Sequence, residues 1–389
     1  MVSTIVKKLK SSKFLYSLYY YIGTFSASLA KLFLSTDDRL ILFVSYGGRK
    51  FEDSPKDIYD CMLKDGRFKD YRLVWAFIDP TKYTLERGEK VCINSIRYIM
   101  LALKARVWIT NVNMKRGLGF AGKHTLSINS WHGTAVKHIG IDSVEGEEFV
   151  SKDKYPLADI MLAQSDYDVN IFSRAFELRK DQVLKTGFPR TDGLIRENSQ
   201  DNIISIKKKL GIPLNKKVIM YAPTFRERKG VHSWEQKSPL NLKKWEEALG
   251  EQYILIIRAH QIVEKMLGVE ENDFVFNFSG YPILNDLLLV TDILISDYSG
   301  ILFDFAVLDR PIICYAYDYD QYVKDRGVYF DVRNELFTES NEDSLINTIS
   351  SNDVSLIMDK TLRFKKKYVQ IAGGSSERVV DIIYNALHN

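Results

Sequence analysis

Short apolar runs alternate with longer amphipathic segments along most of this chain. The runs are rich in β-branched side chains, which is typical of strands buried inside a parallel sheet. The segments expected to be strands are 40–44, 72–77, 107–110, 126–129, 160–163, 182–185, 217–221, 253–257, 275–277, 292–296 and 311–315. Helices are expected at 54–64, 95–104, 239–249, 283–290, 301–308, 344–350 and 354–369. Ser54 and Ser238 each precede a proline and are expected to cap their helices.

The pattern consists of two series of βα units. A polar and basic stretch, 192–214, separates them, and 389 residues are more than one core usually serves. We therefore expect an N-terminal Rossmann-like domain at 39–195, holding the acceptor, and a C-terminal one at 196–389, holding the donor. This α/β pattern predicts a GT-B-like fold, with the two domains facing a cleft at the carboxyl ends of their strands.

Residues 1–38 have a different composition. Lysines mixed with apolar residues come first, and an uncharged stretch rich in tyrosine and serine, 15–30, follows. This stretch is too polar for a signal peptide or a typical spanning helix. It favours an amphipathic helix on an anionic membrane surface, with the lysines toward the headgroups. Packing on the protein's own surface is the first alternative, and a true membrane span is the second.

The overall composition excludes some classes of function. A net charge of +4 is too small to suggest a nucleic-acid partner. The three cysteines, Cys61, Cys92 and Cys314, match no zinc pattern, and the histidines form no metal-binding motif. We therefore expect a reducing cytoplasm, no metal and no cofactor.

A strand, a polar turn and an apolar helix follow one another between 292 and 308. The turn, Ser296 to Gly300, lies where backbone N–H groups at a helix N-terminus can bind an anion. Ser296 or Asp297 could cap the helix, and Ser299 could offer its hydroxyl to a phosphate. The alternative is an ordinary strand-to-helix connection.

Three other polar clusters follow expected strands, at 129–134, 224–226 and 258–260. Ligands of parallel sheets bind beyond the carboxyl ends of the strands. The clusters at 224–226 and 258–260 and the turn at 296–300 all belong to the second series, so these three should lie on the same edge of its sheet. Thr224 lies there with Arg226 and Arg258, whose guanidinium groups suit a diphosphate. Surface ion pairs are the alternative for both arginines.

His132 is the preferred general base, because a neutral imidazole accepts a hydroxyl proton near neutral pH. His260 could hydrogen-bond the transferred phosphate or protonate the leaving group. The alternative for each histidine is a structural role, as a helix cap or bonded in the core. Residues of the first series that could shape the cleft or hold the acceptor are Gly47, Gly133, Thr134 and Lys137, with Gly133 allowing a close approach of substrate.

Four ordered stretches, 130–140, 186–192, 220–226 and 296–305, resemble the CDP-glycerol glycerophosphotransferase family, the teichoic acid primases and polymerases. The resemblance spans roughly residues 40–335 and implies a GT-B fold, a CDP-polyol donor and a lipid-linked acceptor. It also implies attachment to the inner face of the membrane. The family's two catalytic histidines match His132 and His260, and its donor-binding turn matches Ser296, Asp297 and Ser299.

The sequence departs from the family pattern at several positions. The family usually has Pro-Leu-Lys-Lys after its WHGT motif, where this chain has Ala135 to His138. It usually has tryptophan at the position of Phe225 and serine at that of Gly300. These changes concern the identity of the substrate more than the type of reaction.

The predicted function is therefore polyol-phosphate transfer. Glycerol phosphate or ribitol phosphate would pass from a CDP-polyol to a hydroxyl of an undecaprenyl-linked saccharide or a growing polymer, with release of CMP. We place this peripheral enzyme at the cytoplasmic face of the membrane. The alternatives are a GT-B glycosyltransferase that uses a nucleotide sugar and a catalytically silent, membrane-associated nucleotide-binding protein.

Overall fold

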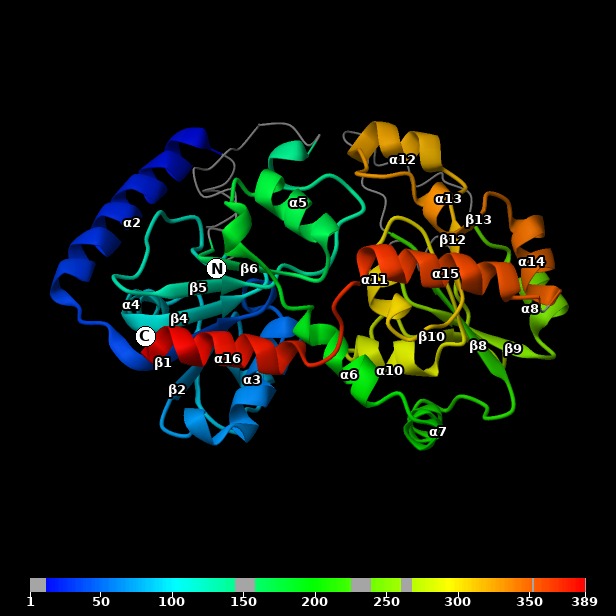
Figure 1. Cartoon of the computed structure of the whole chain (residues 1–389), viewed down its shortest axis with the longest axis horizontal. Coiled ribbons are helices and arrows are strands. Elements are labelled where there is room, and N and C mark those ends of the chain that lie inside the picture. The colour runs from blue at the N-terminus through cyan, green and yellow to red at the C-terminus, as the bar shows by residue number, and fades with distance from the viewer. Residues whose placement is uncertain (1–11, 144–157, 225–238, 260–267, 352, 389) are drawn as a thin grey trace.

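The computed structural model describes residues 12–143, 158–224, 239–259, 268–351 and 353–388. Two lobes lie side by side, each built on a parallel sheet (Figure 1). We call the lobe of the first sheet the N-lobe and that of the second the C-lobe. Two Rossmann-like lobes with a cleft between them are the predicted GT-B-like arrangement, which is confirmed.

The N-lobe sheet has the strand order β3-β2-β1-β4-β5-β6-β7. Its strands are nearly continuous apolar runs, because helices cover both faces of the sheet. They are β1 (Asp37–Val44), β2 (Arg72–Phe77), β3 (Glu89–Cys92), β4 (Ala105–Thr110), β5 (Leu126–Asn129), β6 (Ile160–Ala163) and β7 (Val183–Lys185). One face is covered by α3 (Ser54–Lys64), α5 (Asp166–Ala175) and α16 (Ser375–His388), and the other by α2 (Lys13–Phe33) and α4 (Ile96–Lys104).

The C-lobe sheet has the order β10-β9-β8-β11-β12-β13. Its strands are β8 (Lys217–Ala222), β9 (Tyr253–Ile257), β10 (Val275–Asn277), β11 (Ile293–Ser296), β12 (Ile312–Tyr315) and β13 (Phe337–Glu339). Among the described residues, the helices of this lobe are α6 (Asp192–Arg196), α7 (Gln200–Lys209), α8 (Leu242–Leu249), α10 (Leu284–Val290), α11 (Ile301–Ala306), α12 (Tyr319–Arg326), α13 (Val332–Glu335), α14 (Glu342–Ser350) and α15 (Ser355–Tyr368). The strand order reverses between β8 and β11, where a ligand is expected to bind.

The prediction of one C-terminal domain at 196–389 is wrong for the last helix, which belongs to the N-lobe. After α15 the chain crosses back, and α16 packs against α3 of the N-lobe (Figure 1). Its buried side chains Val379, Val380 and Ile383 complete the N-lobe core. Asp192 fixes the start of α16 by accepting hydrogen bonds from the N–H groups of Ser375 and Ser376. No apolar pattern reveals such a crossing, because the helix is amphipathic in either lobe.

The stretch 192–214, expected to separate the two series, contains α6 and α7. Two local predictions are also corrected. Helix α3 is capped by Asp53, whose carboxylate accepts a hydrogen bond from the N–H of Ser54, so Ser54 is the first helical residue. Helix α8 begins at Leu242 behind the cap Asn241, and Pro239 lies outside it, while Ser238 falls outside the described residues.

Helix α2 lies along the outer edge of the N-lobe (Figure 1) and packs on it through small and polar side chains. The Tyr19 hydroxyl donates to the carbonyl of Arg116, and Thr24 Oγ1 accepts from the N–H of Gly119. The outward face is apolar, with exposed residues Phe14, Leu18, Tyr21, Ile22, Phe25, Leu29, Leu32 and Phe33. In the part of the chain that the structure describes, no helix has both the length and the apolar character needed to cross a bilayer.

Candidate active site

A cavity of about 510 Å³ lies between the two lobes. Its N-lobe wall consists of residues 131–137, Ile139 and Arg190, which follow β5 and β7. Its C-lobe wall comes from the ends of β8, β9 and β11 together with Leu284, Asp304 and Arg326. The cavity is therefore at the predicted rim of both sheets and has the volume of a small-molecule site.

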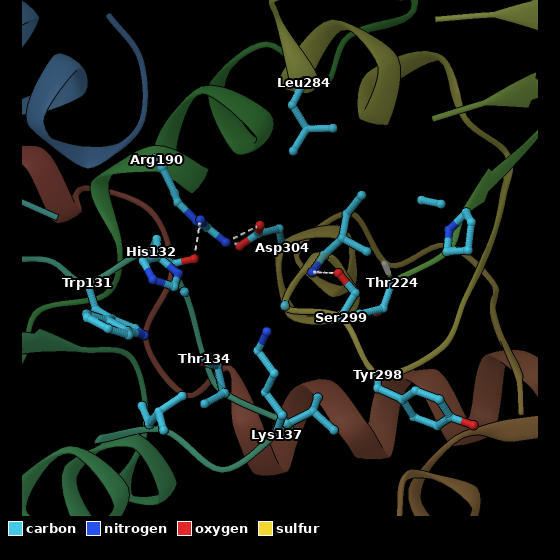
Figure 2. Close-up of a pocket in the computed structure, with 18 of the residues that line it drawn as sticks. Trp131, His132, Thr134, Lys137, Arg190, Thr224, Leu284, Tyr298, Ser299 and Asp304 are labelled. Atoms are coloured by element: carbon cyan, nitrogen blue, oxygen red, sulfur yellow. Dashed lines mark hydrogen bonds and ion pairs between the residues drawn. The ribbon is translucent and has the colours of Figure 1, made fainter. Parts of the chain in front are cut away.

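His132 lies on the N-lobe wall with its ring stacked on that of Trp131, 4.1 Å between centroids (Figure 2). The centroid of the Tyr46 ring lies 6.3 Å from that of the His132 ring, and the two ring planes are inclined by 25°. Burial lowers the pKa of His132 to about 4, with Asp53 acting against this shift and Arg190 adding to it. The imidazole is therefore neutral at physiological pH and can accept a proton.

The backbone around His132 is held in unusual conformations. Trp131 has a φ of 49° and Gly133 a φ of 110°, so left-handed residues flank the histidine on both sides. The N–H of Trp131 donates to Asn129 Oδ1 at 2.7 Å. A Cβ on Gly133 would lie 2.4 Å from Arg190 Nη2, so glycine here makes room for a guanidinium. Gly133 also lines the cavity, and the close approach of substrate expected there stays a prediction.

Arg190 forms a buried cluster that joins the two lobes. Its Nη1 donates to the carbonyl oxygen of His132 at 2.7 Å and to Asp53 Oδ2 at 3.3 Å. Its Nε and Nη2 form a fork with the carboxylate of Asp304 on α11 (Figure 2). Asp53 also accepts from the Tyr46 hydroxyl at 2.6 Å. Two buried carboxylates therefore balance one guanidinium directly behind His132.

Thr134 is buried and its hydroxyl faces the N-lobe interior, where Oγ1 accepts from Gln164 Nε2 at 2.8 Å. Asp168 lies in the same network and accepts from the N–H of Gln164 and the hydroxyl of Ser165. Gln164 Oε1 has no hydrogen-bond partner among the described residues. Burial raises the pKa of Asp168 to about 7, which favours a proton on this carboxyl group. A hydrogen bond with the Thr134 side chain acts to lower the pKa of Asp168.

On the C-lobe wall, Asp297 holds two loops together. Its carboxylate accepts from the N–H of Thr224 at 2.9 Å and from that of Tyr298 at 2.6 Å. Ser296 is also buried, and its hydroxyl donates to the carbonyl of Ala222 at 2.6 Å. Neither residue lines the cavity. Both were predicted to bind the donor, but the structure shows them shaping the rim on which Thr224 and Tyr298 lie.

Ser299, Gly300 and Thr224 do line the cavity, as predicted, and face the N-lobe wall. Ser299 Oγ accepts from the N–H of Ile301 at 3.3 Å, at the start of α11. Arg258 also reaches the cavity, but its Nη1 donates to the carbonyls of Phe278, Ser279 and Tyr281. Part of its guanidinium therefore supports the loop that follows β10.

Lys137 reaches toward the middle of the cavity (Figure 2). Its segment crosses to the C-lobe, where Lys137 pairs with Val328 in an antiparallel bridge. The N–H of Tyr329 donates to the carbonyl of Val136 at 2.8 Å in the same pairing. This bridge places Arg326, a cation that the sequence interpretation overlooked, on the cavity wall.

One predicted position that the structure describes is not brought into the cavity, and two others cannot be placed relative to it. Gly47 lies in a short 3-10 turn, Tyr46–Gly48, next to the cluster of Arg190, and is absent from the lining. Arg226 and His260 fall outside the described residues. The residues missed were Tyr46, Asp53, Arg190 and Asp304, although Arg190 and Asp304 both lie inside stretches that carry the family resemblance. Polar residues within an apolar helix, such as Asp304, were the available signal.

Comparison with known proteins assigns this two-lobed transferase fold to a family. The model of the CDP-glycerol:poly(glycerophosphate) glycerophosphotransferase family matches residues 26–385. The teichoic acid glycerol-phosphate transferase of Staphylococcus aureus is 30% identical, over 99% of this chain and 100% of that protein. The teichoic acid poly(glycerol phosphate) polymerase of Bacillus subtilis is also 30% identical, over 90% of this chain but 49% of the polymerase.

Solved structures agree with the sequence comparison. A histidine-to-alanine variant of the wall teichoic acid polymerase TagF superposes with a TM-score of 0.81 at 28% identity, covering 91% of this chain and 90% of that one. A histidine variant of TagF soaked with CDPG gives a TM-score of 0.83 at 26% identity, over 94% and 98% of the two chains.

The fold and the site thus define a GT-B-like transferase with a cationic cavity between its lobes. The chain belongs to the CDP-glycerol glycerophosphotransferase family, and it is a CDP-polyol phosphotransferase of teichoic acid synthesis. This result confirms the predicted family, fold and reaction class. It also favours phosphotransfer over the two alternatives, glycosyl transfer and silent nucleotide binding.

Proposed function

We propose that the enzyme transfers glycerol phosphate or ribitol phosphate from its CDP-polyol to a hydroxyl of a polyprenyl-diphosphate-linked saccharide or growing polymer. One observation carries the proposal: a neutral, half-buried imidazole faces the 298–301 turn across a cavity lined by cations. Phosphoryl transfer depends mainly on positioning and charge stabilisation, which this cavity can supply from side chains and backbone.

In the proposed mechanism, His132 accepts the proton of the acceptor hydroxyl as its oxygen attacks the β-phosphorus. The bond between that phosphorus and the bridging oxygen breaks, and CMP leaves with the bonding electrons. Ser299, Gly300 and Thr224 hold the diphosphate on the C-lobe wall, with Arg258 nearby. Lys137 stabilises charge in the middle of the cavity. His260 keeps its predicted role at the leaving group as part of the proposal.

The variant His132→Ala tests the assignment of the base. Loss of a general base lowers turnover by about 10²–10⁴-fold, whereas donor binding should persist because the C-lobe wall is intact. CMP release from CDP-glycerol and CDP-ribitol gives the turnover, and the thermal shift with each donor gives binding. His124→Ala, an exposed histidine outside the cavity, is the matched control. Wild-type turnover in His132→Ala would end the assignment.

The pH dependence provides a second test of the same base. A base with a pKa of about 4 remains competent until the pH falls below that value. The acid limb of kcat/KM for the free enzyme should therefore lie near pH 4, well below the ordinary histidine range. A limb near pH 6.5, the reference value, would show that another group acts as the base.

We further propose that the enzyme is peripheral and binds the cytoplasmic face of the membrane through the outward face of α2. A surface helix normally turns its apolar stripe inward, but here the stripe faces outward and Phe25 is 69% exposed. Such a face matches a helix that lies in the interfacial plane of a bilayer. Membrane binding by this stripe is compatible with the alternative that α2 packs on the protein's own surface, because the opposite face of the helix packs on the N-lobe.

Cosedimentation with anionic liposomes tests this orientation. Phe25→Glu should reduce the pelleted fraction strongly, because a charge enters the apolar stripe. Ile96→Glu is the matched control, since Ile96 is 80% exposed but lies on α4. Point variants are preferable to deletion of the helix, which would uncover the side of the N-lobe around Leu118. Equal pelleting of the Phe25 and Ile96 variants would contradict the proposal.

A further inference from the structure

Arg190 occupies the junction of the two lobes and contacts both. It follows β7 of the N-lobe, and its side chain is only 14% exposed. Its hydrogen bonds reach the carbonyl of His132, the N-terminal cap of α3 and the carboxylate on α11. A fork of this kind fixes direction as well as distance, which an ammonium group cannot do.

The charge of Arg190 is already balanced, so it is poorly suited to bind the donor. The carboxylate of Asp304 accepts hydrogen bonds from Nε and Nη2 of the guanidinium. Asp53 and the carbonyl of His132 both accept from the third nitrogen, Nη1. Both carboxylates are nearly completely buried. A guanidinium committed to such partners gains little from a phosphate.

The backbone of His132 requires external support. Its neighbours Trp131 and Gly133 both have positive φ, and the segment belongs to no helix or strand. Residues in such conformations persist only where their surroundings hold them. The bond from Arg190 Nη1 to the His132 carbonyl is a direct support of this kind, and the missing Cβ of Gly133 lets the guanidinium lie against the loop.

We propose that Arg190 is a positioning residue that couples His132 of the N-lobe to α11 of the C-lobe through Asp304. The base is then correctly placed only when the lobes hold the arrangement seen here, with the 298–301 turn across the cavity. This inference rests on the role of His132 given under the proposed function. It differs from a purely structural ion pair, which would affect folding but not the alignment of the base.

The variants Arg190→Lys and Asp304→Asn test the coupling. Lysine keeps the charge but loses the fork, and asparagine weakens the link to α11. Each should lower kcat by about 10²-fold, the size expected for a misplaced catalytic group, with donor affinity by thermal shift nearly unchanged. The double variant should be no worse than either single one, because the two residues act as a unit.

Arg174→Lys is the matched control. Arg174 also forms a fork, with Asp142, close to the C-lobe residue Tyr329, but it is 59% exposed and outside the cavity. Its replacement should leave kcat at the wild-type value. Wild-type kcat in Arg190→Lys and Asp304→Asn, or effects that simply add in the double variant, would overturn the coupling.

The variant Arg190→Gln adds a readout that a structural role would not change. The titratable side chains that face His132 are those of Asp53, Arg190, Lys137 and Tyr46. Once the charge of Arg190 is removed, the carboxylate of Asp53 should raise the pKa of the His132 imidazole. The acid limb of kcat/KM should move toward neutral pH in Arg190→Gln but not in Arg190→Lys. An unmoved limb in both variants would contradict the contact between Arg190 and the working base.

His132→Ala, measured in parallel, separates the two proposals. If it retains turnover, the base is wrongly assigned and the proposed mechanism fails. If it loses turnover while Arg190→Lys and Asp304→Asn keep the wild-type kcat, the base stands and only the coupling fails.

Discussion

The two walls of the cavity are built differently. On the N-lobe wall and directly behind it, Tyr46, Asp53 and Trp131 all have positive φ, and a charged cluster is buried. On the C-lobe wall, no described residue among 222–224, 258–259 and 298–304 has positive φ, and Asp297 accepts hydrogen bonds from backbone N–H groups. Backbone strain is therefore concentrated around His132, the proposed base, while the wall proposed to bind the donor uses relaxed turns.

The largest expected effect comes from adding one methyl group to each wall. Gly133→Ala places a Cβ 2.4 Å from Arg190 Nη2 at a φ of 110°, so it should cost about 3 kcal/mol in the free energy of unfolding. Gly300→Ala meets only the carbonyl of Thr134 at 3.3 Å, with a φ of −61°, and should cost less than about 1 kcal/mol. Urea unfolding measures both. Equal costs would remove the contrast between the walls.

The next effect tests the hydrogen bonds that hold the C-lobe wall. Asp297→Ala leaves the N–H groups of Thr224 and Tyr298 without their carboxylate, at a cost of about 2 kcal/mol. Donor affinity should fall as well, because both residues line the cavity. Unfolding curves and the thermal shift with CDP-glycerol provide the measurements. A variant with normal stability and normal donor binding would show that Asp297 does not organise this wall.

The third prediction concerns the buried carboxyl group of the N-lobe. Asp168 has a pKa of about 7 in the folded protein and about 3.8 as its ordinary value. Between these values the folded state binds more protons than the unfolded state, so this group lowers stability as the pH rises. Asp168→Asn should therefore gain stability relative to wild type between pH 5 and pH 8, by about 1 kcal/mol or more. A relative stability that stays constant or falls would contradict a protonated Asp168.

The smallest stability effect is expected at Ser299, a half-buried residue of the turn proposed to bind the donor. Ser299→Ala should change the free energy of unfolding by less than about 0.5 kcal/mol but weaken donor binding about fivefold. Ser296→Ala is the opposite case, since its buried hydroxyl donates to the Ala222 carbonyl. It should cost about 1 kcal/mol of stability with a smaller effect on binding. A larger loss of stability in Ser299→Ala together with a larger loss of donor binding in Ser296→Ala would contradict these assignments.

The sequence was sufficient for the architecture and for placing His132 on the cavity wall, while its role as the base stays a prediction. Buried parallel strands have a strong local signature, so β2, β5, β6, β9 and β10 begin and end where expected. His132 stands out because it follows such a strand in a polar cluster. The strong signals in both cases are local, and they do not depend on how the two lobes are placed.

The residues that the sequence could not assign depend on tertiary contacts. Arg190 and Asp304 are 114 positions apart, and neither alone distinguishes a buried pair from two surface charges. Asp297 has the sequence context of a phosphate-binding turn, yet its carboxylate serves the neighbouring loop. Helix α16 could not be assigned to the N-lobe, because its apolar stripe would fit either core.

The return of α16 to the N-lobe has a consequence for the synthesis of the protein. The core of the first lobe includes Val379, Val380 and Ile383, which the ribosome adds only after all the strands of the C-lobe sheet. The N-lobe must therefore wait, with the apolar surface of α3 uncovered, until the C-lobe segment and α16 have emerged. The C-lobe core, made largely of residues between 194 and 369, does not have to wait in this way and can mature first.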